Sequence, residues 1–281
     1  MRPLAKLLEG ELNPEELSLV PRSYDIIGSE SGAVAVVEIP EELLNRKEAV
    51  AEAILKSNKN VKSVLNKSSG RKGTYRLEEL EVIAGDENTE VLHKEFGYTL
   101  KLDPRKVFFS PREATERQRI ASQVKASETV LVMFSGIGVY PISIAKKQPL
   151  VGKVYGIEIN PDAHLYAQEN VRMNKLAHKI VLINDDVRNA CKVFNFKFDR
   201  IAMPMAVGGE KYLDYAFKLV KDGGIIHFYS TGNDKNLFAE SEKFVINAAI
   251  NNRKKIHIEN RVKILPFGVK SWKVAVELKV F

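Results

Sequence analysis

Short alternating strands and a single helix make up the pattern of hydrophobic and polar positions over residues 24–102. The helix is expected near residues 41–57. Strands are expected on both sides of it, at 24–28, 33–39, 61–66, 75–84 and 98–102. This mixture predicts a small α+β domain, which we place at residues 1–102.

From residue 103 onward the pattern changes to strands that alternate with helices. The expected strands are apolar runs at 129–134, 153–158, 179–184, 199–203 and 224–229, and amphipathic segments of helical length separate them. This rhythm is typical of a parallel sheet with crossover helices. After a helix near 236–252, two strand-like runs at 255–265 and 272–280 predict a closing antiparallel hairpin. We therefore predict an α/β fold for residues 103–281, a Rossmann-like, doubly wound domain of the class I methyltransferase type.

The composition suits two soluble domains, because 281 residues that are 44% hydrophobic can form a core in each. No apolar stretch approaches the roughly 20 residues that cross a bilayer, and the N-terminal residues lack the apolar segment of a signal peptide. We expect a cytoplasmic monomer with no membrane partner. Cys191 is the only cysteine and the five histidines lack ligand spacing, so we expect no metal site.

Positive charge changes this picture only slightly. The net charge of +7 suits a polyanionic partner, but it fits a surface of solvated lysines equally well. The turn at residues 67–73 is rich in glycine and serine and carries three positive charges. It is interpreted either as a phosphate-contacting loop or as a solvated hairpin loop.

A glycine-rich turn, Phe134-Ser-Gly-Ile-Gly138, follows the first strand of the second domain and precedes a helix. Glycines allow the backbone to approach a ligand closely, and a helix N-terminus offers unpaired N–H groups. Pro141 stands where a dinucleotide-binding G-x-G-x-x-G sequence has its third glycine, and no Gly-Lys-Ser/Thr of a P-loop follows. Dinucleotides and nucleoside triphosphates are therefore disfavoured.

Carboxylates follow the next two strands. Glu158 lies 20 residues beyond Gly138, where it can accept both ribose hydroxyls of a nucleoside, and Asp186 can accept a hydrogen bond from an adenine amino group. Each carboxylate alone also fits a helix cap. Three such features at consecutive strand ends favour S-adenosylmethionine. Its expected binding residues here are Phe134, Ser135, Gly136, Ile137, Gly138, Glu158, Ile159, Asp186 and Val187.

Several further motifs are more specific. They read Ser-Tyr-Asp-Ile-Ile-Gly at 23–28, Gly-Thr-Tyr-Arg-Leu at 73–77, Leu-Asp-Pro-Arg-Lys-Val-Phe-Phe-Ser-Pro-Arg at 102–112, Thr-Glu-Arg at 115–117, Ile-Glu-Ile-Asn-Pro at 157–161, Asp-Val-Arg at 186–188 and Gly-Gly-Ile-Ile-His-Phe-Tyr at 223–229. Over roughly residues 20–281 the sequence resembles the archaeal and eukaryotic tRNA guanosine-37 N1-methyltransferases and the related aminocarboxypropyltransferases of wybutosine synthesis. The Ser-Pro-Arg and Thr-Glu-Arg block is the specific part, because a generic methyltransferase has no reason to carry it.

The resemblance implies two catalytic residues. In that family the glutamate of the Glu-Arg pair takes the proton of guanine N1 and an arginine of the preceding domain holds O6, which correspond to Glu116 and Arg76 here. Guanine N1 is a poor nucleophile while protonated, so transfer to it needs a base and a cation near O6. A carboxylate with an unshifted pKa of about 4.3 is a weak base, and we therefore expect Glu116 to be partly desolvated in the complex. The alternative role of Glu116 is an i,i+3 partner of Arg119.

The same segment concentrates positive charge, in Arg112, Arg117 and Arg119. Contact with RNA phosphates is the functional interpretation, most strongly for Arg112, and a solvated basic face is the alternative. Phe108 stacks on a base or on the cofactor, or else belongs to the core. Pro204 is expected to border the cofactor, because the segment after the fourth strand lies beside the transferred group in the family.

Three departures from the family pattern affect the assignment of the product. Val132 replaces an acidic residue ahead of the glycine-rich turn, and Ala206 and Val207 replace a proline and a lysine after the fourth strand. Only about 20 residues precede the Ser-Tyr-Asp motif, whereas the N1-methyltransferases carry an additional N-terminal domain. Length favours the aminocarboxypropyltransferases, whereas Arg112 favours the methyltransferases.

Three hypotheses follow. The leading one is N1-methylation of guanosine 37 in tRNA, with Glu116 as the base and Arg76 at O6. The second is transfer of the 3-amino-3-carboxypropyl group of S-adenosylmethionine to a tricyclic guanosine derivative, a wyosine precursor, in tRNA. The third, from another class, is an RNA-binding protein with weak or no catalysis.

Overall fold

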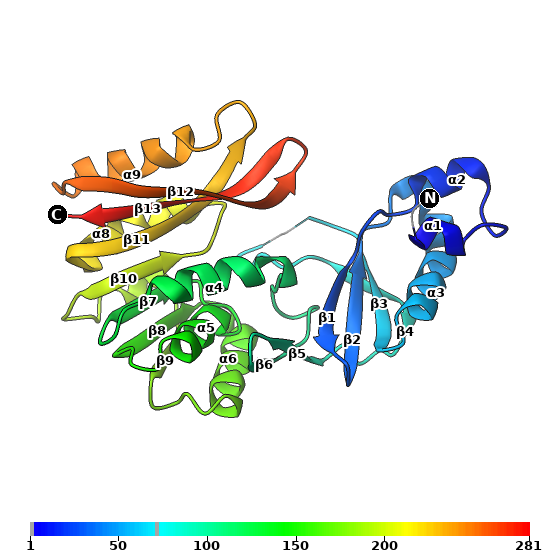
Figure 1. Ribbon diagram of the computed structural model, residues 1–281, viewed down its shortest axis with the longest axis horizontal. Coiled ribbons are helices and arrows are strands. Elements are labelled where there is room, and N and C mark those ends of the chain that lie inside the picture. The colour runs from blue at the N-terminus through cyan, green and yellow to red at the C-terminus, as the bar shows by residue number, and fades with distance from the viewer. Residues whose placement is uncertain (1–2, 71–72) are drawn as a thin grey trace. The chain divides into compact units, whose positions relative to one another are not determined.

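The computed structural model describes residues 3–70 and 73–281, which form two compact units, Met1–Pro111 and Arg112–Phe281 (Figure 1). Residues 103–111 belong with the first unit, so the division falls after the boundary expected at residue 102. Arg71 and Lys72, two of the three charges of the turn at 67–73, lie outside the described residues. No helix in the described part of the chain is both long and apolar enough to cross a membrane.

The first unit is the expected small α+β domain. Its four-stranded sheet has the order β1-β2-β3-β4, in which only β2 and β3 run parallel, and a separate hairpin of β5 and β6 follows. The strands are β1 (Asp25–Ser29), β2 (Gly32–Val37), β3 (Val61–Lys67), β4 (Leu80–Gly85), β5 (Val91–Glu95) and β6 (Tyr98–Leu102). The helical segments are α1 (Pro3–Leu7), α2 (Pro14–Leu19), η1 (Glu41–Arg46) and α3 (Lys47–Ser57).

Differences from the expected elements have local causes. The strand expected at 75–84 begins only at Leu80, because residues 73–76 form a turn in which Arg76 adopts a positive φ of 55°. Neither α1 nor α2 was expected. The short helix α2 is fixed at its start by a capping box, in which the Asn13 side chain accepts from the backbone N–H of Glu16 and the Glu16 carboxylate accepts from that of Asn13.

The second unit confirms the predicted Rossmann-like α/β fold with a closing hairpin. Its seven-stranded sheet has the order β12-β13-β11-β10-β7-β8-β9; β7 to β11 are parallel and β13 runs antiparallel to both of its neighbours. The strands are β7 (Thr129–Met133), β8 (Lys153–Glu158), β9 (Ile180–Asn184), β10 (Phe198–Met203), β11 (Val220–Asn233), β12 (Ile256–Gly268) and β13 (Ser271–Val280). The helical segments are η2 (Pro111–Glu113), α4 (Ala114–Gln123), α5 (Val139–Lys147), α6 (Pro161–Met173), α7 (Val187–Ala190), η3 (Gly209–Tyr212), α8 (Leu213–Leu219) and α9 (Ala239–Asn251).

Helices cover both faces of this sheet, and Figure 1 shows α4, α5 and α6 together on one of them. Alternate strand residues face opposite sides of a sheet. Ile226 and Phe228 of β11 join the apolar cluster formed with α8 and α9, so His227 and Tyr229 point to the opposite face. All four side chains are buried. The face that carries α4 therefore contains buried polar groups, and these need partners there.

Candidate active site

The turn after β7 approaches α5 and α6 closely. Phe134, Gly136 and Gly138 have positive φ angles of 59°, 54° and 81°, and Gly138 is the N-cap of α5. A Cβ atom on Gly138 would lie 3.2 Å from the Cβ of Ala167 in α6. The backbone N–H of Ser135 donates to the carbonyl of Ile157 at 2.9 Å, which holds the turn against β8. This geometry explains why glycines occupy the turn.

Glu158 ends β8 and is tied to the same turn. Its carboxylate accepts from the backbone N–H of Gly136 at 2.7 Å and from that of Asn160 at 2.8 Å. Burial raises the pKa of Glu158 above its usual value, although these backbone donors act in the opposite direction. A carboxylate oxygen can accept more than one hydrogen bond, so Glu158 can still accept ribose hydroxyls while it holds the glycine-rich turn. The turn and Glu158 therefore fit an adenosine ligand such as S-adenosylmethionine.

Asp186 lies where it was expected, at the end of the next strand, but its side chain is engaged locally. It caps α7 by accepting from the backbone N–H of Arg188 at 2.8 Å, and it forms an ion pair with the Arg188 guanidinium at 2.6 Å. Arg188 thereby lowers the pKa of Asp186. Its adenine contact stays a prediction. The other expected cofactor residues at these strand ends are Ile137 and Val187, which are buried, and Ile159 and Pro204, which are half-buried.

Glu116 projects from the first turn of α4 into the buried polar face. The Arg119 guanidinium donates to both carboxylate oxygens, each at 2.7 Å, and the Tyr229 hydroxyl donates to Oε1 at 2.5 Å. Only 5% of Glu116 is exposed. The i,i+3 pair with Arg119 is therefore present, and the carboxylate is buried in the protein without RNA. Its role as a base stays a prediction.

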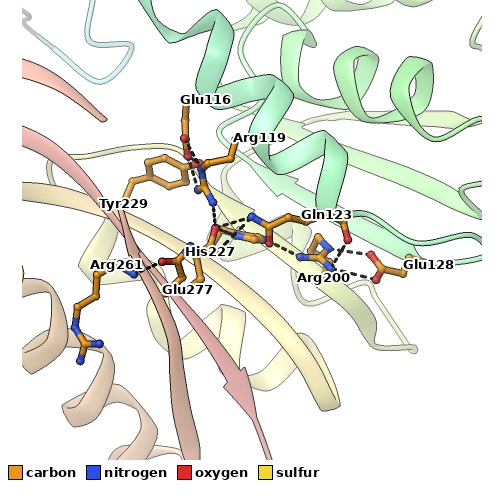
Figure 2. A network of polar contacts seen from close by, with 10 residues as sticks. Glu116, Arg119, Gln123, Glu128, Arg200, His227, Tyr229, Arg261 and Glu277 are labelled. Carbon is orange, nitrogen blue, oxygen red and sulfur yellow. Dashed lines mark hydrogen bonds and ion pairs between the residues drawn. The ribbon is translucent and has the colours of Figure 1, made fainter. Parts of the chain in front are cut away.

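A chain of polar contacts continues from Arg119 across the sheet (Figure 2). Arg119 also binds Glu277 of β13, and Glu277 contacts Nδ1 of His227 at 2.9 Å. Nε2 of His227 lies 2.7 Å from Nη1 of Arg200, and Arg200 forms an ion pair with Glu128 at 2.9 Å. Of these residues, Glu128, Arg200 and Glu277 were not predicted from the sequence, and His227 appeared there only within the motif at residues 223–229. The sequence signal for Arg200, His227 and Glu277 is a polar or charged residue inside an apolar strand.

Lys273 of β13 makes a second buried connection. Its ammonium donates to the Glu113 carboxylate at 2.8 Å and to the carbonyl of Pro204 at 3.0 Å. It also lies 5.1 Å from the centre of the Tyr229 ring. Lys273 therefore ties the segment after β10, which includes Pro204, to the residue that precedes α4.

The remaining expected site residues differ in exposure. Arg112 is exposed, but Arg117 is buried with only 2% of its surface accessible, and Arg119 is bound to two carboxylates. The structure thus does not place Arg117 and Arg119 on a solvated basic face, and of the three arginines Arg112 is the most exposed. Arg76 is half-buried and Phe108 is exposed, and both belong to the first unit. Their roles stay predictions.

Comparison with known proteins identifies the family. The model of the TRM5/TYW2 methyltransferase domain matches residues 91–259, and the model of the TYW2 N-terminal domain matches residues 4–89. The chain belongs to the TRM5/TYW2 family. The S-adenosylmethionine dependence of this family agrees with the positions of the glycine-rich turn and Glu158. The structure of Methanocaldococcus jannaschii TYW2, at 29% identity, is a complex with AdoMet.

Members with two different activities resemble this TRM5/TYW2 chain. It is 35% identical over 268 residues, 95% of this chain and 78% of the relative, to the tRNA (guanine(37)-N(1))-methyltransferase Trm5b of Pyrococcus abyssi. It is 31% identical over 282 residues, 99% of this chain and 96% of the relative, to the tRNA(Phe) (4-demethylwyosine(37)-C(7)) aminocarboxypropyltransferase of Pyrococcus horikoshii.

Solved structures of both kinds of enzyme are also similar to this chain. The crystal structure of P. abyssi Trm5b superposes with a TM-score of 0.85 at 35% identity and covers 96% of this chain and 78% of that one. The structure of P. horikoshii TYW2 in complex with MeSAdo gives a TM-score of 0.80 at 29% identity, covering 100% and 99%. Family membership therefore does not distinguish transfer of the methyl group from transfer of the aminocarboxypropyl group.

Proposed function

We propose that this chain transfers the methyl group of S-adenosylmethionine to N1 of guanosine 37 in tRNA. The observation that carries the proposal is the buried carboxylate of Glu116, which follows the Ser110-Pro-Arg112 motif and lies in the same unit as the glycine-rich turn. The similarity to Trm5b over 95% of the chain supports the same product.

The cofactor supplies an electrophilic carbon on a sulfonium ion. Residues 134–138 bring the backbone close to it, and Glu158 accepts the ribose hydroxyls. When the cofactor is bound, Asp186 and Val187 would hold the adenine, with Asp186 accepting from its amino group, and Pro204 would lie on the side of the transferred group. Phe108 stacks on the cofactor or on a base.

Glu116 accepts the N1 proton, and Arg76 stabilises the charge that develops on O6. Within Glu116, Oε1 already accepts hydrogen bonds from Arg119 and Tyr229, whereas Oε2 accepts one from Arg119. We therefore assign the proton to Oε2, which has the greater remaining acceptor capacity. The rigid fork of Arg119 fixes the direction of that oxygen.

The partner is tRNA, and Arg112 contacts its phosphates. A phosphate contact supplies affinity without reading sequence. Arg112→Gln should therefore weaken binding of all tRNA substrates to a similar degree and reduce the salt dependence of binding, with the cofactor affinity unchanged.

Transfer of the aminocarboxypropyl group to a wyosine precursor is the second candidate. Two observations favour it: residues 4–89 match the TYW2 N-terminal domain, and the P. horikoshii aminocarboxypropyltransferase aligns with 99% of this chain. Ala206 and Val207, in the segment that follows the anchored carbonyl of Pro204, also depart from the sequence expected of a methyltransferase.

An RNA-binding protein with weak catalysis is the third candidate. It is favoured by Val132, which is fully buried in β7 and offers no carboxylate near the turn. Calorimetric titration with S-adenosylmethionine tests this candidate directly, because the two enzyme candidates both require measurable binding.

The by-product decides between the two reactions. The purified protein is incubated with S-adenosylmethionine and either unmodified tRNA or tRNA that carries 4-demethylwyosine, and the digested nucleosides and small molecules are identified by mass spectrometry. Methyl transfer gives N1-methylguanosine and S-adenosylhomocysteine, whereas aminocarboxypropyl transfer gives methylthioadenosine. Methylthioadenosine with no N1-methylguanosine would overturn the leading proposal. Glu116→Gln should abolish most of the product, and Glu240→Gln, an exposed glutamate of α9, serves as the control.

A further inference from the structure

Arg119 is shared between two buried carboxylates. Its Nε and Nη2 groups donate to Glu116, and its Nη1 group donates to Glu277 of β13. Glu116 and Glu277 are 5% and 4% exposed, so neither carboxylate is stabilised mainly by solvent. One guanidinium thus balances two buried anions, and the interaction of Arg119 with either carboxylate depends on the other.

Glu277 is held as an anion by its remaining neighbours. The side-chain amide of Gln123 donates to it at 3.1 Å, and Nδ1 of His227 lies at 2.9 Å. Since the Arg200 guanidinium can only donate, Nε2 of His227 is the acceptor, and the ring proton sits on Nδ1 and is donated to Glu277. Burial alone would raise the pKa of Glu277, but the interactions with His227 and Arg119 outweigh it and hold that pKa well below its usual range.

We propose that Glu277 is a positioning residue for the transfer reaction, which holds Arg119 and thereby sets both the orientation and the proton affinity of the Glu116 carboxylate. This inference rests on the proposed function, in which Glu116 takes the N1 proton. When Glu116 becomes neutral, Arg119 retains an anionic partner in Glu277 and needs no rearrangement. The base can therefore be protonated without leaving a buried arginine uncompensated.

The electrostatic surroundings of Glu116 come from several elements packed against it. The charged and titratable groups are Arg117 and Arg119 of α4, Glu113 of η2, Tyr140 of α5, Tyr229 of β11 and, beyond these, Glu277 and Lys273 of β13. Lys273 is paired with Glu113, and Arg119 is the cation bound directly to Glu116. A single substitution at Glu277 therefore changes how strongly Arg119 interacts with Glu116.

The direction of the effect follows from charge. In Glu277→Gln, the Arg119 cation is balanced by Glu116 alone and the repulsion between the two carboxylates disappears. Both changes favour the ionised form of Glu116, so the acid limb of the pH–rate profile should move to lower pH. The expected shift is about one pH unit, because the charge removed from Glu277 acts on Glu116 through their shared partner Arg119. In Arg119→Met the favourable cation is lost, and the acid limb should move to higher pH.

The test measures single-turnover methylation of tRNA from pH 5 to 9 for the 281-residue parent protein and four variants, Glu277→Gln, Arg119→Met, Arg119→Lys and Glu240→Gln. We expect opposite shifts for the first two. Arg119→Lys keeps the charge but loses the two-pronged contact, so its acid limb should stay near that of the parent while its rate falls about tenfold. Glu240→Gln should match the parent in both respects.

The outcomes separate the two levels of the proposal. If the parent protein gives no N1-methylguanosine, the proposed function fails. If the parent is active but Glu277→Gln only lowers the rate, with an unshifted acid limb, then Glu277 has a purely structural role and the inference is overturned. Circular dichroism and the melting temperature of each variant identify any that fail to fold. If Glu277→Gln is one of them, the milder His227→Gln replaces it. Its acid limb should move to higher pH, opposite to the shift expected for Glu277→Gln, because Glu277 loses a donor and binds Arg119 more strongly at the expense of Glu116. An unshifted limb in that variant also overturns the inference.

Discussion

Replacing Arg200 by methionine should destabilise the second unit strongly. Arg200 is 4% exposed, and its guanidinium serves three acceptors: the Glu128 carboxylate at 2.9 Å, Nε2 of His227 at 2.7 Å and the backbone carbonyl of Gln123 at 3.0 Å. Methionine fills much of the volume but donates to none of them. The substitution therefore leaves one anion and two polar atoms without this donor at the interface between the sheet and α4.

The size of the effect follows from the burial of these groups. Breaking a buried ion pair by removing one partner costs about 3–5 kcal/mol, because the remaining charge stays desolvated. For a unit of this size each kcal/mol corresponds to roughly 2–4 °C in melting temperature. We therefore expect the unfolding transition of the second unit to fall by on the order of 10 °C.

Arg261→Met provides a matched control. Arg261 also pairs with a glutamate, Glu242, but 46% of its side chain is exposed, and exposed pairs contribute little because solvent screens them. Differential scanning calorimetry of both variants and the parent at one pH gives the comparison. If Arg200→Met melts within about 2 °C of Arg261→Met, the buried contacts do not stabilise the unit and the reasoning is wrong.

Three further predictions concern the cofactor turn and pH. Glu158→Ala removes the acceptor of the Gly136 N–H and should weaken S-adenosylmethionine binding at least about tenfold by calorimetry, with Glu240→Ala unchanged. Gly156→Ala places a Cβ 2.9 Å from Ser135 Oγ, so it should displace the turn and weaken the same binding; an unchanged affinity would contradict this packing. Burial lowers the pKa of His227 below its usual value, so the unfolded chain binds its proton first as pH falls below about 6.5. Stability should therefore decrease from pH 7 to 5 in urea titrations, and less steeply in His227→Gln.

The strands of the parallel sheet could be predicted because burial on both faces makes them continuous apolar runs. The run at 153–158 coincides with β8, and that at 129–134 differs from β7 by one residue. By contrast, β5 has the sequence Val-Leu-His-Lys-Glu, whose polar residues resemble those of a loop. It is a strand because it pairs with β6, a contact that local pattern does not reveal.

The residues of the candidate site likewise differ in whether local sequence pattern predicts them. The glycine-rich turn and Glu158 could be located from the sequence because the turn follows one apolar strand and Glu158 ends the next. Arg119 could be predicted as a partner of Glu116 from its i,i+3 spacing, but the distant contacts could not, since Tyr229 lies 113 residues away in the sequence and the contact of Arg119 with Glu277 spans 158 residues. The expectation that Arg117 contacts RNA phosphates rests on the positive charge concentrated in its segment, whereas helix α4 turns the Arg117 side chain into the core.

The two roles that the sequence suggests for Glu116 are compatible in the structure. The ion pair with Arg119 supplies the fixed orientation that a base needs, and burial supplies the desolvation. They still differ in consequence. If Glu116 only pairs with Arg119, Glu116→Gln lowers the melting temperature and leaves the single-turnover rate of the folded fraction intact. If it is the base, the rate falls far more than the folded fraction does, because glutamine keeps one acceptor oxygen for Arg119 and Tyr229 but cannot accept a proton at neutral pH. Measuring the melting temperature and the single-turnover rate on one preparation of Glu116→Gln therefore distinguishes a structural role of Glu116 from a catalytic one.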